Sequence, residues 1–201
     1  MELGRDTALI VVDVQRDFLP GGALPVPRGG EIVPAVNRLS EGFHAHGLTV
    51  VYTRCWLPAD HTSFHGQGGR LEPYCVQDTQ GAEFADDLQI PEGVWIISKG
   101  THRDQDVLSG FRNTGLGEKL REAGIEQLLV CGLSTEIAIK NTVLDALESG
   151  FEVILVADAC RGFNRQIADS ARAVEEMLRH GARIASSGAV QNALEAYSAT
   201  G

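Results

Sequence analysis

Apolar positions fall into short continuous runs separated by segments of mixed polarity. Five runs stand out, at residues 8–14, 48–53, 94–98, 127–133 and 151–159, and a weaker sixth covers 182–187. Continuous apolar runs of this length are typical of strands that are buried on both faces, as in parallel sheets. The pattern therefore predicts six strands.

The segments between these runs have the spacing of amphipathic helices. Two apolar faces are predicted, one formed by Ile32, Val36, Leu39 and Phe43 and the other by Ile167, Ala171, Val174 and Leu178. Glycines follow the expected helices just before the next strand, where a left-handed C-cap is favoured, at Gly47, Gly124, Gly150 and Gly181. Alternating strands and helices predict an α/β fold: a three-layer α/β/α sandwich with a six-stranded, mainly parallel sheet, in a single domain spanning residues 1–201.

In such a sheet, ligands bind beyond the carboxyl ends of the strands. Three places in the sequence reach that edge: Asp13 at the end of the first strand, Lys99 after the third, and residues 133–138 after the fourth. The irregular, glycine-containing stretch at 54–93 is long for a compact domain, and long loops of this kind are usually functional.

Composition narrows the function class. The net charge of −10 leaves no basic surface for a nucleic acid, so we expect a small-molecule ligand and no nucleic-acid partner. The apolar run near the N-terminus is too short for a membrane span, and no membrane partner is expected. Four cysteines without a paired motif indicate reduced thiols and a cytoplasmic protein.

Asp13 lies inside a run of valines, where a carboxylate is costly to bury unless a cation or donor faces it. A simple interpretation is an aspartate that caps a loop at the strand end. The alternative pairs it with Lys99. In a desolvated pocket, such a carboxylate can act as a general base while the ammonium stabilises developing negative charge.

Several motifs resemble those of nicotinamidases, within the isochorismatase-like hydrolase superfamily. They are "ALIVVDVQRDFLPGGAL", "HTSF", "CVQDTQGAEF", "SKGT", "CGLSTEIAIKNTVLDAL" and "VADACRGF", in the family's order over residues 8 to about 187. The resemblance implies the strand order 3-2-1-4-5-6 and a homo-oligomer. It also implies catalytic roles for Asp13 and Lys99, and an oxyanion site at the backbone of Ser134 and Ala138.

The family's nucleophile is a cysteine that attacks an amide carbonyl and forms a thioester. The matching position here is Ala138, which has no group able to attack. Loss of a nucleophile costs about 10⁶-fold in turnover in a well-studied serine protease, so amide hydrolysis of the family's kind is expected to be almost lost.

The family's metal site also differs. The matching positions carry Cys55, Leu57, His61 and Tyr74, so only His61 remains from the family's ligands. We therefore expect no metal and no other cofactor. An alternative is a new soft-ligand site formed by Cys55, His61 and His65, with a thiolate and two imidazoles suited to zinc.

The resemblance places Phe18, Leu24, Trp56 and Leu71 around the substrate pocket, although each is equally well a core residue. Three functions follow. The first is a nicotinamidase-related hydrolase of a small amide or related molecule. The second is a metal- and thiol-independent hydrolase of vinyl ethers, like the isochorismatases. The third is a non-catalytic protein that binds a small molecule.

Overall fold

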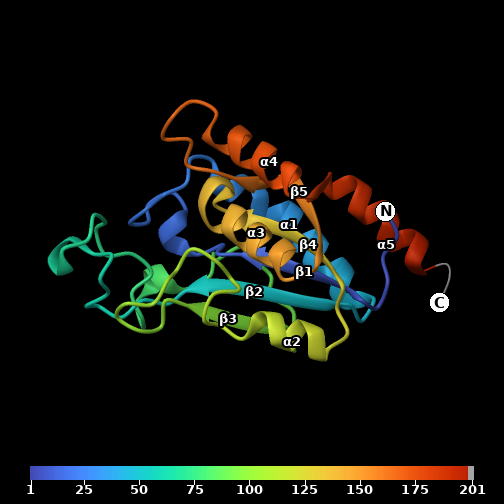
Figure 1. The fold of residues 1–201 in the computed structure, drawn as a ribbon, viewed down its shortest axis with the longest axis horizontal. Helices are drawn as coiled ribbons and strands as arrows, with labels where there is room; N and C mark the ends of the chain where they lie inside the picture. The colour runs from blue at the N-terminus through green and yellow to red at the C-terminus, as the bar shows by residue number, and fades with distance from the viewer. Residues whose placement is uncertain (199–201) are drawn as a thin grey trace.

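A single six-stranded sheet forms the centre of the computed structural model, which describes residues 1–198 (Figure 1). Its order is β3-β2-β1-β4-β5-β6, and every neighbouring pair is parallel. The strands are β1 (Thr7–Val12), β2 (Thr49–Cys55), β3 (Trp95–Lys99), β4 (Gln127–Leu133), β5 (Glu152–Arg161) and β6 (Arg183–Ala185). The predicted fold class and strand order are confirmed.

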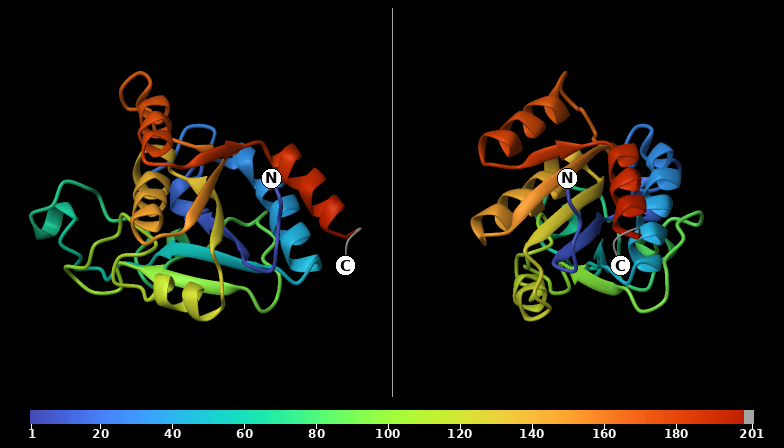
Figure 2. Two further views of the ribbon diagram at one scale, coloured as in Figure 1. Left: turned by 45° about the vertical axis from the view of Figure 1, so that its right-hand side comes forward. Right: turned by 90° about the vertical axis from the view of Figure 1, so that its right-hand side faces the viewer.

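Helices cover both faces of the sheet (Figure 2). On one face α1 (Val33–Ala45) packs beside α5 (Ser187–Ser198), and on the other α3 (Lys140–Glu148) packs beside α4 (Asp169–Arg179). The short helix α2 (Leu116–Glu122) lies near β3. The β1 segment Ala8–Val12 is fully buried between these layers, which explains why it carries no polar residue.

The expected face of α1 is confirmed, because Ile32, Val36, Leu39 and Phe43 are all fully buried. The face predicted for α4 is wrong except at Val174, which is half-buried against the core. Ile167 is 93% exposed and precedes the helix, and Leu178 is 43% exposed, while Ala173 and Met177 form the buried positions instead. Counting the helical period from a loop residue shifted the predicted face.

The end of the chain also differs from the prediction. The strand expected over 182–187 is shorter, since α5 begins at Ser187. This helix was not predicted. Val190 and Leu194, spaced one turn apart, are its buried contacts with the core. The four glycines expected after helices do have positive φ, from 66° at Gly47 to 105° at Gly181.

The long segment between β2 and β3 contains short 3₁₀ turns, at His65–Gln67 and Gln80–Ala82, and isolated bridges rather than long elements. It projects beyond the carboxyl ends of the strands, drawn teal to green in Figure 1. Within residues 1–198, none of the helices has the length and apolar character needed to cross a membrane.

Candidate active site

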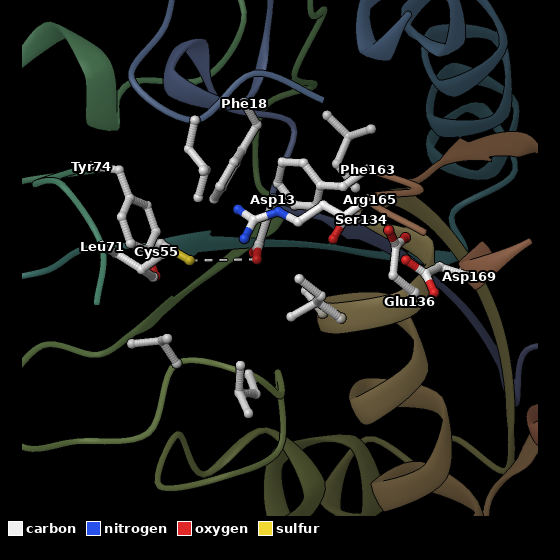
Figure 3. A pocket seen from close by; sticks show the side chains of 16 residues that line it. Asp13, Phe18, Cys55, Leu71, Tyr74, Ser134, Glu136, Phe163, Arg165 and Asp169 are labelled. Carbon is white, nitrogen blue, oxygen red and sulfur yellow. Dashed lines mark hydrogen bonds between the residues drawn. The ribbon is translucent and has the colours of Figure 1, made fainter. Parts of the chain in front are cut away.

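A cavity of about 250 Å³ opens at the carboxyl ends of the central strands (Figure 3). It is bounded by the end of β1, the end of β2, the turn after β4, and the segment between β2 and β3. Its lining is mostly apolar, as in many small-molecule sites. The edge of the sheet predicted to bind a ligand is therefore hollow.

Asp13 lies at the inner end of this cavity, 1% exposed. Its backbone has φ of 50°, a left-handed conformation that costs a non-glycine residue about 1 kcal/mol or more. Each carboxylate oxygen is engaged. Thr53 Oγ1 donates to Oδ1 at 2.6 Å, while Lys99 Nζ donates to Oδ2 at 2.5 Å. The surroundings thus supply donors that suit a carboxylate.

Lys99 lies next to Asp13, outside the cavity lining, and is fully buried. Its ammonium also donates to the carbonyl oxygen of Val107 at 3.0 Å. Burial favours the neutral amine, but the negative charge of Asp13 and its hydrogen bond to the ammonium outweigh it, so the pKa of Lys99 is raised above its ordinary value. Lys99 does not itself line the cavity and contacts the lining residue Asp13.

The thiol of Cys55 faces the same carboxylate. Its Sγ lies 3.5 Å from Asp13 Oδ2 and lines the cavity, as the dashed line in Figure 3 shows. The buried amide of Gln15 holds the Cys55 backbone on both sides: Oε1 accepts from Cys55 N at 2.7 Å, and Nε2 donates to Cys55 O at 2.8 Å. Nothing in the sequence patterns singled out Gln15 or Thr53.

Two more residues adjoin Cys55 from the long segment. Cys75 is buried beside Cys55, and Tyr74 lines the cavity. Burial is the main cause that raises the pKa of both Cys75 and Tyr74 well above their ordinary values. Both groups therefore remain protonated near neutral pH and can act as hydrogen-bond donors.

The opposite side of the cavity is formed where β4 ends. Ser134 and Ala138 both line it, and the chain turns there into a π-helical turn, Thr135–Ile139, that leads into α3. Gly132 makes this approach possible, because a Cβ atom at that position would lie 2.2 Å from the carbonyl oxygen of Val12. The Ala138 methyl group thus lies in the cavity with Asp13 and Cys55.

Three of the four residues expected in the pocket line it: Phe18, Leu24 and Leu71. Trp56 lies elsewhere, with the Arg54 guanidinium 3.8 Å from its ring centroid. The reason is the alternation of side chains along an extended chain, which sends Cys55 toward the cavity and its neighbour Trp56 away from it.

A loop after β5 forms the mouth of the cavity. It contributes Phe163 and Arg165, and Figure 3 shows the Arg165 guanidinium pointing into the cavity. Within the described part of the chain, Arg165 forms no ion pair; its guanidinium carbon lies 5.5 Å from the Phe163 ring centroid. Glu136 and Asp169 accept bonds from backbone N–H groups at Asn164 and Gln166, at 2.7 and 2.8 Å, and so hold the loop.

The residues present do not fit the metal site that the resemblance implies. His61 Nδ1 lies 2.8 Å from Ser63 Oγ, and Nε2 lies 3.0 Å from the carbonyl oxygen of Gln105, so both ring nitrogens are engaged. His65 is exposed and pairs with Glu72. Among residues 1–198 no three ligand side chains gather around one point, and the Cys55–His61–His65 arrangement is not assembled.

Comparison with known proteins identifies the family. The profile of the isochorismatase domain matches residues 7–188. This chain belongs to the isochorismatase family. The family member is 38% identical over 199 residues to the nicotinamidase of Escherichia coli (strain K12), an alignment that covers 88% of this chain and 93% of that protein.

Other relatives include both a named amidase and a protein named as inactive. The pyrazinamidase of Pyrococcus horikoshii, solved in complex with zinc, superposes with a TM-score of 0.86 at 46% identity, covering 90% of this family member and 99% of that chain. A protein of Arabidopsis thaliana named a probable inactive nicotinamidase is 31% identical over 173 residues, covering 79% of this chain and 82% of that protein.

Proposed function

We propose that the chain is a hydrolase of a small amide or a related acyl compound, with Asp13 and Lys99 as its proton-transfer pair. The observation that carries this proposal is the buried ion pair, 2.5 Å from Nζ to Oδ2, at the inner end of an apolar cavity. A carboxylate held by donors can accept a proton from an attacking group and return it to the leaving group.

The cavity favours a small molecule with an apolar body. Phe18, Leu71 and Phe163 provide apolar walls, and the Arg165 guanidinium at the mouth is free to pair with an anionic or strongly polar substituent. The names of two relatives, nicotinamidase and pyrazinamidase, denote amidases, which supports the amide class. Because the metal ligands do not fit, we propose that this site holds its substrate without a metal contact.

A nucleophile at position 138 is not part of this proposal, because the Ala138 methyl group cannot attack a carbonyl. The backbone at Ser134 and Ala138 remains beside the cavity, so it can still receive the substrate oxygen as the resemblance implies. Residue 138 therefore shapes the site and does not supply its chemistry.

Hydrolysis of a vinyl ether is the second candidate, since a site without a nucleophile at 138 or a metal suits it. That reaction needs Asp13 to donate a proton to carbon. Thr53, Lys99 and Cys55 all donate to its carboxylate oxygens, an arrangement in which Asp13 is an acceptor, and this counts against the role. A non-catalytic binding protein is the third candidate.

The test is a screen of ammonia release from nicotinamide, pyrazinamide and small aliphatic amides by the wild type and by Asp13→Asn. We expect turnover that the substitution abolishes. Turnover that survives Asp13→Asn would place the site elsewhere. Release of product from chorismate-type enol ethers alone would establish the second candidate, and thermal stabilisation by these compounds without any turnover would establish the third.

We further propose, from the family resemblance, that the protein is a cytoplasmic homo-oligomer. Light scattering coupled to gel filtration would test the assembly. A monomer at micromolar concentration would contradict that part of the proposal.

A further inference from the structure

We propose that Cys55 is the nucleophile of this site, with its thiol on β2 attacking the acyl carbon of the substrate. This inference rests on the proposed function and names the group that performs its first step. Position 138 contributes a methyl group, yet Cys55 brings a thiol to the same cavity from another strand.

The geometry around Cys55 is that of a nucleophile and its base. Its Sγ lies 3.5 Å from Asp13 Oδ2, a distance that suits a thiol donating to a carboxylate. Lys99 Nζ contacts that same oxygen atom. In the sheet Cys55 is also the register partner of Lys99, so the thiol and the ammonium are positioned by adjacent strands.

The neighbouring thiol of Cys75 is less suited to attack than that of Cys55. Cys75 does not line the cavity, and burial raises its pKa well above the ordinary value, so its thiol stays protonated near neutral pH. Cys55 is therefore the thiol that both lines the cavity and contacts the Asp13 carboxylate.

Side-chain hydrogen bonds hold the backbone of Cys55 in place, in addition to its strand pairing. Gln15 binds both its N–H and its carbonyl, and the second Nε2 bond of Gln15 runs to the carbonyl of Ala82 at 2.8 Å. An attacking atom must be held within a few tenths of an ångström of its productive position. The buried glutamine provides that restraint.

The other thiols lack these features. Cys131 and Cys160 lie in β4 and β5 and do not line the cavity. Burial raises the pKa of Cys131 well above its ordinary value, and it raises the pKa of Cys160 to about 12. Cys55 therefore differs from them in its base, its cation and its access to the cavity.

The reaction balances with groups already in place. The thiol proton passes to Asp13 Oδ2 as the sulfur–carbon bond forms, and the same proton goes to the leaving amine as the carbon–nitrogen bond breaks. Water then attacks the thioester, gives a proton to Asp13, and releases a carboxylic acid as the sulfur–carbon bond breaks. The thiolate finally takes that proton back from Asp13.

The test uses p-nitrophenyl acetate, which reports acylation whatever the natural substrate is. We expect a burst of about one equivalent of p-nitrophenol, with acetyl mapped by mass spectrometry to the peptide carrying Cys55 and removed by neutral hydroxylamine, as a thioester requires. Cys55→Ser should slow the burst by at least about a hundredfold, and Asp13→Asn should slow it as well. Cys160→Ala is the matched control and should leave the burst unchanged.

Acetyl on another residue, or an unchanged burst in a folded Cys55→Ser variant, would overturn the assignment. Peptide mapping of the wild type decides the question even if the serine variant does not fold. Amide turnover that survives Cys55→Ser would refute Cys55 while the proposed function stands. Selective acetylation of Cys55 in a protein that hydrolyses no amide would support Cys55 and refute the proposed function.

Discussion

Replacing Lys99 with methionine should destabilise the protein strongly. The change keeps an unbranched apolar side chain of similar size but removes the ammonium, leaving the Asp13 carboxylate buried with the hydroxyl of Thr53 and the thiol of Cys55 as donors. Breaking a fully buried ion pair by removing one partner costs about 3–5 kcal/mol. For a chain of this size each kcal/mol corresponds to roughly 2–4 °C, so the melting temperature should fall by about 6–20 °C.

Urea unfolding followed by circular dichroism would measure this loss. The exposed pair between Arg183 and Glu152, 2.7 Å apart with side chains 55% and 67% exposed, gives a matched control. Arg183→Met should cost no more than about 1 kcal/mol. The double variant Asp13→Asn/Lys99→Met should recover much of the loss, because no unpaired charge remains. A loss below about 1 kcal/mol for Lys99→Met would refute the reasoning, since it would mean that water reaches the pair.

Three further results are expected. The pKa of Lys99 is raised above its ordinary value of 10.5, so the stabilisation from its charge is complete below about pH 10.5 and is lost as the pH rises above it. Urea unfolding above that pH should therefore show a steeper fall in the unfolding free energy for the wild type than for Lys99→Met. Ala138→Cys should add slow, high-KM ammonia release from small amides above the wild-type rate, and a rate no higher than that of the wild type would mean that the cavity does not position an amide beside residue 138. Elemental analysis of untagged protein should find no stoichiometric zinc or iron, whereas one equivalent of zinc that is lost on Cys55→Ala would contradict the interpretation of His61 as a fully engaged side chain.

The sheet was predictable because its strands are buried on both faces and therefore have continuous apolar sequences. The meeting of Asp13 and Lys99 was predictable for a related reason, since both end parallel strands at one edge. Strand order needed the family resemblance, because apolar runs do not specify their neighbours. The contact between Cys55 and Asp13 was missed, although Thr53 and Cys55 share one face of β2 and both bind that carboxylate.

The other incorrect or missed predictions concern positions where tertiary contacts, and not the local sequence pattern, decide what is buried or bonded. The face of α4 was misjudged because the helix begins at Asp169 and Ile167 belongs to the preceding loop. In the sequence Gln15 is only a polar residue after an apolar strand. Its side chain bonds to Cys55 and Ala82, which lie 40 and 67 positions further along the chain. No periodicity within one segment contains that information.

The long segment between β2 and β3 is attached to the β1 end at a few defined points. Ala85 N donates to Val14 O, Arg16 N donates to Glu83 O, and Cys75 N donates to Asp17 Oδ2 at 2.6 Å. These bonds join residues far apart in the chain and mostly involve backbone atoms, so they do not depend on the exposed side chains that the segment carries between its buried residues. A segment of different sequence could therefore be grafted between β2 and β3 while residues 14–17 are kept, which would exchange the wall at Leu71 and Tyr74 and alter ligand selectivity without rebuilding the sheet.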